Sequence, residues 1–194
     1  MPRLIELARP VKPGKLTAII RINGVSVFVH WSVFVITGML LLGVIRRPWM
    51  TLVGILCYLS MLLIHECGHM IAAQRKGCEV YSIQLYPIFG RCCFQVPWSR
   101  FDHCVIAWAG VLAQALVALP LLLWVAIFGY TRFEPINAVF AILGGISLVI
   151  AVLNLIPVPP LDGSIAWGLI PEWFKRVRTR AKRPPKRRSD WRTY

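Results

Sequence analysis

The chain has 194 residues, of which 57% are hydrophobic and 15% are charged. Its 22 lysines and arginines outnumber eight acidic residues, which gives a formal net charge of +14. This composition excludes a disordered chain, a disulfide-stapled secreted scaffold and an ordinary soluble enzyme. Because most basic residues lie outside four long apolar runs, the pattern is typical of a membrane protein with basic flanks.

Residues 1–24 predict a basic arm without regular structure, because Pro2, Pro10 and Pro13 interrupt it. A membrane-embedded core is expected over residues 25–174. A basic tail at residues 175–194 follows, with ten basic residues and one acidic residue. Since loops rich in lysine and arginine stay on the cytoplasmic side, the arm and the tail are both expected to be cytoplasmic. Only Arg46 and Arg47, which this topology places outside, run against the rule.

Four segments are apolar and about as long as the 20 residues that a helical bilayer crossing needs. They run from Val25 to Ile45, from Trp49 to Ala73, from Cys104 to Phe128 and from Ile136 to Ile156. The sequence therefore predicts an all-α polytopic membrane protein with about four transmembrane helices.

The cysteines do not indicate a metal cluster, because no two of them form a Cys-x-x-Cys pair. Most fall on predicted membrane or cytoplasmic segments, where thiols stay reduced, and they are interpreted as small packing residues. They are Cys57, Cys67, Cys78, Cys92, Cys93 and Cys104.

The second apolar segment contains an H-E-x-x-H motif, His65-Glu66-Cys67-Gly68-His69. Residues four apart lie on one face of a helix, so both imidazoles can reach the same metal ion, with Glu66 beside it. A chance match is the alternative. Three ionisable side chains on one turn of an apolar helix need a compensating partner, however, and a divalent cation is the natural one.

Two histidines leave a catalytic zinc site one protein ligand short. Asp162 is the only acidic residue near the end of the fourth segment, where three prolines in four residues stop the helix. Gly163 allows a tight turn that could direct Asp162 inwards. The predicted topology brings Asp162 and the H-E-x-x-H motif to the same cytoplasmic side. The alternative role for Asp162 is to cap a short helix from Ser164 to Leu169.

These paired motifs resemble the site-2 protease family of intramembrane zinc metalloproteases. About ninety residues separate H-E-x-x-H from the second motif, Asn154…Pro157-x-Pro159…Leu161-Asp162-Gly163. Weaker similarities are His30-Trp31-Ser32 and Ala109-Gly110-Val111-Leu112-Ala113-Gln114, where the family often has Ala-Gly-Pro-Leu-Ala-Asn. Gln114 replaces an asparagine there, which leaves its role open. The resemblance covers about Val27 to Ile170, and we expect a minimal member without PDZ or CBS domains.

The resemblance implies one zinc ion per chain, held by His65, His69 and Asp162, with Glu66 as the general base and acid. It implies hydrolysis of peptide bonds within or near transmembrane segments of membrane-protein substrates, as in regulated intramembrane proteolysis. Asn154 would hold substrate backbone, and a helix–helix hydrogen bond is its alternative role. The alternative function is that of a catalytically silent relative, acting as a chaperone or regulator. Such a relative would have lost Glu66 or a ligand.

Between the second and third segments, Tyr81 to Leu85 alternates apolar and polar residues, which is the period of a strand. A turn at Pro87 to Gly90 and a return run at Arg91 to Val96 complete a short re-entrant or membrane-associated β-hairpin. An open edge at Ile83 and Leu85 is predicted to bind an extended substrate by strand addition. A simple cytoplasmic hairpin is the alternative.

The expected partners are a transmembrane protein substrate and the lipid bilayer of a prokaryotic cell membrane, in which the chain is an integral, multi-pass protein. The basic tail is expected to touch anionic lipids, and no specific nucleic acid is expected. A zinc carrier would need polar residues across the membrane, which the fourth segment lacks. His30 and His103 lie near the predicted cytoplasmic ends of their segments. Interfacial hydrogen bonding is their expected role, and substrate contact is the alternative.

Overall fold

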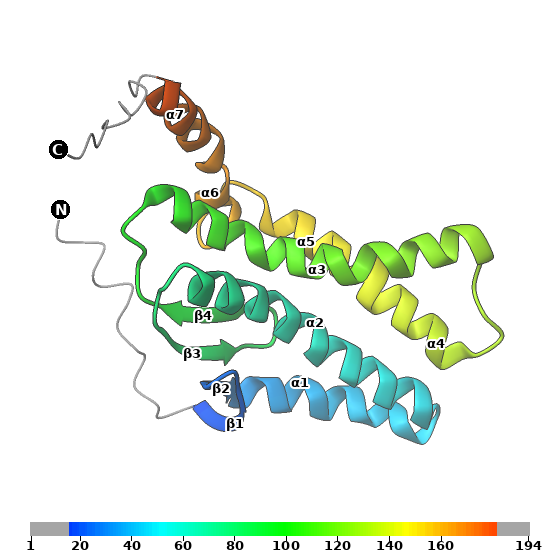
Figure 1. Cartoon of the computed structure of the whole chain (residues 1–194). Coiled ribbons are helices and arrows are strands. Elements are labelled where there is room, and N and C mark those ends of the chain that lie inside the picture. Colours follow the sequence, from blue (N-terminus) through cyan, green and yellow to red (C-terminus); the bar gives the residue numbers. More distant parts are fainter. Residues whose placement is uncertain (1–15, 182–194) are drawn as a thin grey trace, which may run out of the picture.

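The computed structural model describes residues 16–181, with long helices beside a small sheet (Figure 1). The strands are β1 (Leu16–Ile22), β2 (Val25–His30), β3 (Val80–Leu85) and β4 (Gly90–Phe94). The helices are α1 (Trp31–Leu41), α2 (Pro48–Arg75), α3 (Arg100–Phe128), α4 (Glu134–Val139), α5 (Ser147–Asn154), α6 (Gly163–Ala166) and α7 (Leu169–Ala181). A 3-10 turn, Leu42–Ile45, follows α1, and a π-helical stretch, Phe140–Ile146, joins α4 to α5. The predicted arm up to residue 15 and the predicted tail from residue 182 lie outside the described residues.

Three helices in the described part of the chain are long and apolar enough to cross a membrane: Pro48–Arg75, Arg100–Phe128 and Glu134–Asn154. The last combines α4, the π-helical stretch and α5. At 1.5 Å per residue, each exceeds the roughly 30 Å thickness of a hydrocarbon core. They correspond to the predicted second, third and fourth spans. In place of the first, only Trp31–Ile45 is helical, and at roughly 25 Å it is shorter than the core. The predicted count of four is therefore not established.

The sheet has four strands in the order β1-β2-β3-β4, where only a hairpin was predicted. β1 and β2 form one antiparallel hairpin, and β3 and β4 form the other. β2 joins the two hairpins by pairing in parallel with β3, with Ser26 opposite Ser82 and Val29 opposite Leu85. The sheet thus combines segments from before α1 and after α2, so an all-α description is incomplete.

The beginning of the first predicted span is a strand, which corrects the prediction of a helix from Val25. Every second residue of β2 is buried, the period of a strand, and these residues are valines, which favour strands. Asn23 and Gly24 both have positive φ, 48° and 82°, and form the Asn-Gly turn of the first hairpin. Because β1 lies within residues 1–24, the arm predicted to be irregular contributes a strand to the sheet.

The strand predicted to bind substrate is an inner strand. β3 pairs with β2 on one side and with β4 on the other. Ile83 and Leu85 are 0% and 4% exposed and belong to the hydrophobic core that joins the sheet to α2 through Leu62 and Met70. The prediction that Ile83 and Leu85 bind an extended substrate at an open edge is therefore wrong, because β2 already occupies that edge.

Glycines allow the long helices to approach one another closely. A Cβ on Gly68 of α2 would overlap the backbone carbonyl of Ala109 in α3, so the two backbones touch there. A Cβ on Gly144 would lie 3.3 Å from the side chain of Leu122 in α3. Glycine at both positions thus lets α3 pack closely between α2 and the third candidate spanning helix.

Candidate metal centre

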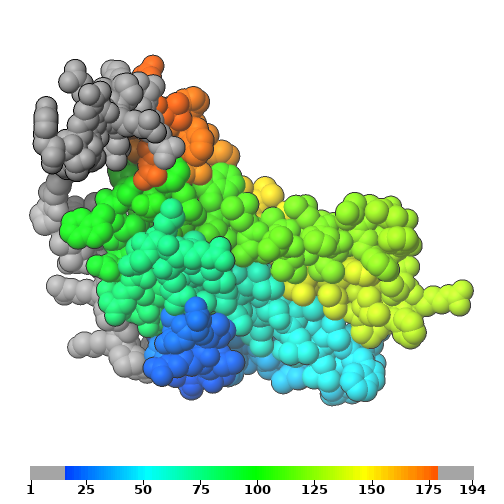
Figure 2. Space-filling model, in the orientation of Figure 1, coloured from blue at the N-terminus to red at the C-terminus, as the bar shows by residue number. Residues whose placement is uncertain are grey.

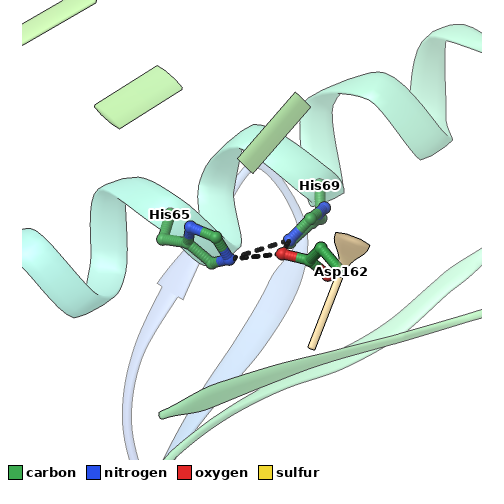
Figure 3. Close-up of side chains that lie close together, drawn as sticks. All are labelled: His65, His69 and Asp162. Carbon is green, nitrogen blue, oxygen red and sulfur yellow. Dashed lines mark hydrogen bonds and ion pairs between the residues drawn. The ribbon is translucent and has the colours of Figure 1, made fainter. Parts of the chain in front are cut away.

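Three side chains from distant parts of the chain converge near the end of α2 that packs against the sheet (Figure 3). His65 and His69 are one turn apart on α2, and Asp162 precedes α6. Asp162 Oδ2 lies 2.9 Å from His65 Nε2 and 3.2 Å from His69 Nε2. The two Nε2 atoms are 3.1 Å apart. The two sequence motifs therefore meet in space.

α3 fixes the orientation of both imidazole rings. His69 Nδ1 donates to the carbonyl oxygen of Ile106 at 2.8 Å, and His65 Nδ1 donates to Gln114 Oε1 at 2.9 Å. A carbonyl oxygen can only accept, so each Nδ1 carries a proton and each Nε2 is the ring nitrogen that faces Asp162. Gln114 Nε2 in turn donates to Ser147 Oγ at 3.4 Å. The role of Gln114, which the sequence left open, is to position His65.

The convergence of three electron-rich atoms fits a metal ion. Two Nε2 atoms and the Asp162 carboxylate face one another at contact distance, an arrangement that requires a positive charge between them. Zinc bonds of about 2.0–2.2 Å to such atoms, at tetrahedral angles, place neighbouring ligand atoms roughly 3.3 Å apart. The observed separations of 2.9, 3.1 and 3.2 Å differ from this value by a few tenths of an ångström. The donor set and its spacing suit zinc.

Asp162 takes part in this group and not in a helix cap. It stands at the position before α6, but its side chain makes no capping hydrogen bond there. Burial raises the pKa of the Asp162 carboxyl, but hydrogen bonds with His65 and His69 outweigh that effect and hold the pKa below its usual range. A Cβ on Gly163 would overlap the carbonyl oxygen of Leu155, so the chain can turn this tightly only with glycine. The carboxylate is thus ionised, as a metal ligand must be.

Glu66 is 3% exposed and lies beside the three-ligand group without belonging to it. Its carboxylate interacts with the backbone N–H of Cys92 in β4, and a Cβ on Gly90 would overlap it. The sheet therefore positions this carboxylate. Sequence patterns indicate no role for Cys92 and only a turn at Gly90, because strand pairing decides what lies beside Glu66.

Gly110 of α3 leaves the space that the two imidazoles fill. A Cβ at this position would overlap His69 Nε2 and lie 2.9 Å from His65 Cε1. The Ala109 to Gln114 segment, noted in the sequence as a weak similarity, thus contributes both the gap at Gly110 and the acceptor at Gln114. Both contributions depend on the packing of α3 against α2, which no local sequence pattern predicts.

The other residues singled out from the sequence lie outside the three-ligand group. Asn154 ends α5 half-buried, and within residues 16–181 its side chain forms no hydrogen bond, including the helix–helix bond that was its alternative role. His30 caps α1 by accepting from the Ser32 N–H at 3.3 Å. The His103 ring contacts Phe94 edge-on, with 6.3 Å between ring centroids. All six cysteines are free thiols.

Comparisons with known proteins found a similar sequence and a similar solved structure. No protein-family model matches the chain. A protein of Synechocystis sp., provisionally named as a zinc metalloprotease, is 31% identical over 75% of this chain and 43% of its own length, so the chain spans less than half of that relative. The solved structure of a site-2 protease from Methanocaldococcus jannaschii has a similar fold, with a TM-score of 0.65 and 21% identity, over 81% of this chain and 72% of that one. Together with the apolar helices and the His-His-Asp group, these findings support the resemblance drawn from the motifs.

Proposed function

We propose that the chain, as a member of the site-2 protease family, is an intramembrane zinc metalloprotease that hydrolyses peptide bonds within or beside transmembrane segments of membrane-protein substrates. The observation that carries this proposal is the convergence of His65, His69 and Asp162 next to the buried carboxylate of Glu66, on a helix long enough to cross a membrane. Ionisable side chains in such a helix mark functional sites, because their desolvation is costly.

His65 Nε2, His69 Nε2 and Asp162 Oδ2 would hold one zinc ion per chain. A bound zinc ion supplies Lewis acidity, which polarises a carbonyl and lowers the pKa of water to about 7. Gln114 and the Ile106 carbonyl keep both imidazoles turned towards the ion through hydrogen bonds of 2.9 and 2.8 Å. Because Nδ1 donates in these outer contacts, Nε2 is the ring nitrogen that would release its proton and bind zinc.

Glu66 performs the proton transfers. Its carboxylate accepts a proton from the attacking water as the new bond from oxygen to the substrate carbonyl carbon forms. The same proton passes to the amide nitrogen as the carbon–nitrogen bond breaks, so Glu66 ends the cycle ionised. The Cys92 N–H and the side-chain-free Gly90 keep the carboxylate in the position where both transfers can occur.

Substrate presentation involves β4 in place of β3. A transmembrane helix must unwind before hydrolysis, because hydrogen bonds within the helix occupy its carbonyl groups. Among the described strands, β4 and β1 are the two edges, and β4 is the one that contacts Glu66. Pairing with β4 would hold an unwound segment extended beside the catalytic carboxylate. Asn154, which shortly precedes Asp162 in the sequence, would bind the backbone of the substrate.

This role of β4 predicts a position-specific crosslink. A photoreactive residue at Arg91, exposed on β4, should form adducts with a substrate trapped by the Glu66→Gln variant. The same residue at Ile19, exposed on the other edge strand, is the matched control and should form few. Equal yields at the two positions would argue against strand addition at β4.

Zinc removal tests the function as a whole. The purified full chain, reconstituted in vesicles with single-span membrane proteins, should release fragments when loaded with about one zinc per chain. Chelation should stop cleavage, and added zinc should restore it, because the ion supplies the Lewis acidity. If the substrates stayed intact even when the protein held zinc, before chelation and after zinc was added back, the result would contradict the proposal. The catalytically silent relative would then be the better description.

A further inference from the structure

α7 carries a stripe of apolar side chains that the rest of the described chain leaves uncovered. Ile170, Trp173, Phe174 and Val177 are between 51% and 64% exposed. Their spacing of three, four and seven residues from Ile170 places all four on one face of the helix. Glu172 and Lys175 occupy the opposite face and form an ion pair at 2.8 Å. α7 is thus an amphipathic helix with an accessible apolar face.

α7 is attached to the protein mainly by polar side chains. Arg176 donates to Ser99 Oγ at 3.0 Å, and its guanidinium carbon lies 3.9 Å from the ring centroid of Phe101 at the start of α3. The Trp173 ring stacks on the Phe101 ring beside this contact, with 6.3 Å between the ring centroids. Because these contacts hold one side of α7, most of its apolar stripe is directed away from the protein. A helix that only packed on α3 would bury the stripe instead.

The position of α7 matches the depth of a membrane interface. It lies beside the first turns of α3, which is long enough to cross a bilayer, so α7 is near the end of a spanning segment. In Figure 1, α7 lies beyond the beginning of α3 and runs obliquely to it. Figure 2 shows it projecting from the body of the molecule. An amphipathic helix at the end of a spanning segment, with its apolar face uncovered, is suited to lie in the plane of the membrane interface.

The positive charge of α7 favours binding to an anionic membrane surface. Arg176 and Arg178 flank the apolar stripe, and the sequence from residue 175 to the end has ten basic residues and one acidic residue. Clustered cations next to a membrane segment attract anionic headgroups, and long basic side chains reach the phosphates while their stems stay in apolar surroundings. The same charge disfavours a second copy of this chain on the stripe, because like charges would meet.

We propose that α7 lies in the membrane interface on an anionic lipid surface, with Ile170, Trp173, Phe174 and Val177 immersed at the boundary of headgroups and acyl chains. Arg178, beside the apolar stripe, binds lipid phosphate groups there, and α7 fixes the beginning of α3 at the depth of the headgroups. This inference does not depend on protease activity, because it concerns a surface away from the metal centre.

Site-specific photocrosslinking of the full chain tests this placement. p-Benzoylphenylalanine is introduced at Phe174, or at Lys175 on the opposite face as the matched control. Each protein is reconstituted in vesicles of phosphatidylcholine alone, or with about one third phosphatidylglycerol, and irradiated. Mass spectrometry should find lipid adducts at position 174 and at least about fivefold fewer at position 175. Phosphatidylglycerol should be enriched in the adducts above its share of the bilayer.

The other outcomes overturn the proposal. A dimer-sized product at position 174 would show that a second copy covers the stripe, and a protein without adducts would show that the stripe faces water. Arg178→Gln should lower the ratio of phosphatidylglycerol adducts to phosphatidylcholine adducts about fivefold, which corresponds to about 1 kcal/mol per basic residue near an anionic surface. An enrichment unchanged by this variant would overturn the assignment to anionic lipid. Zinc content measured in every variant confirms that each one is folded.

Discussion

Replacing Glu66 with glutamine is expected to lower peptide-bond cleavage about 1,000-fold, within the range that general acid–base groups contribute. Glutamine has nearly the same shape and keeps an oxygen for the Cys92 N–H, but it cannot accept and return a proton. Glu66 does not belong to the three-ligand group, so about one zinc per chain should remain bound. Substrate fragments and zinc content, measured on the same purified protein, separate the two effects.

Glu79→Gln is the matched control for this substitution. Glu79 is an exposed glutamate just before β3, so the change removes the same charge away from the metal centre. Cleavage by this variant should match that of the unmodified chain. Full proteolysis by Glu66→Gln would remove Glu66 from the mechanism, and loss of zinc from it would mean that the carboxylate supports metal binding.

Replacing Asp162 with alanine is expected to lower zinc affinity by more than about 100-fold and to abolish cleavage. The substitution removes one of three ligand atoms and the negative charge that balances the ion. Gln114→Leu keeps all three ligand atoms but removes the hydrogen bonds of Gln114 to His65 and Ser147, and outer contacts of this kind contribute about 10–100-fold to metal affinity. The two variants should therefore rank in that order in a competition titration with a zinc chelator.

Asp190→Ala, in the basic tail outside the described residues, is the control and should leave zinc affinity unchanged. Unchanged affinity in Asp162→Ala would mean that the 2.9 and 3.2 Å contacts with the histidines do not represent metal ligation. A larger loss in Gln114→Leu than in Asp162→Ala would mean that the orientation of His65 matters more than the third ligand.

The sequence predicted the parts of the site that depend on short-range spacing. The separation of His65 and His69 by four residues fixes both on one helical face whatever the fold. The prolines after Asn154 end the helix and release Asp162, which the structure places against the histidines. Of the four apolar segments predicted to span a membrane, three correspond to helices of sufficient length.

The parts that the sequence did not predict depend on pairing between distant segments. The sequence predicts a helix over β2 because β2 continues directly into the apolar residues of α1. The length of the combined apolar segment obscures the alternation of buried and half-buried residues that is typical of a strand. β2 pairs in parallel with β3, although α1 and α2 separate the two strands in the chain. No local sequence pattern encodes a pairing between such distant segments. That pairing in turn removed the edge expected at Ile83 and Leu85. Gln114 and Gly110 gained their roles only through the contact of α3 with α2.

The parallel pairing of β2 and β3 also constrains the parity of membrane crossings. The chain leaves the sheet at His30 and rejoins it at Val80, so the excursion through α1 and α2 starts and ends on one side. The excursion from Arg100 to Asp162 also returns, because Asp162 contacts His65 near the sheet. The far turns are linked by Arg47 and Glu134, 3.2 Å apart. We therefore expect each excursion to cross the membrane an even number of times, and residues 16 and 162 to lie on one face of the membrane, even though α1 is short.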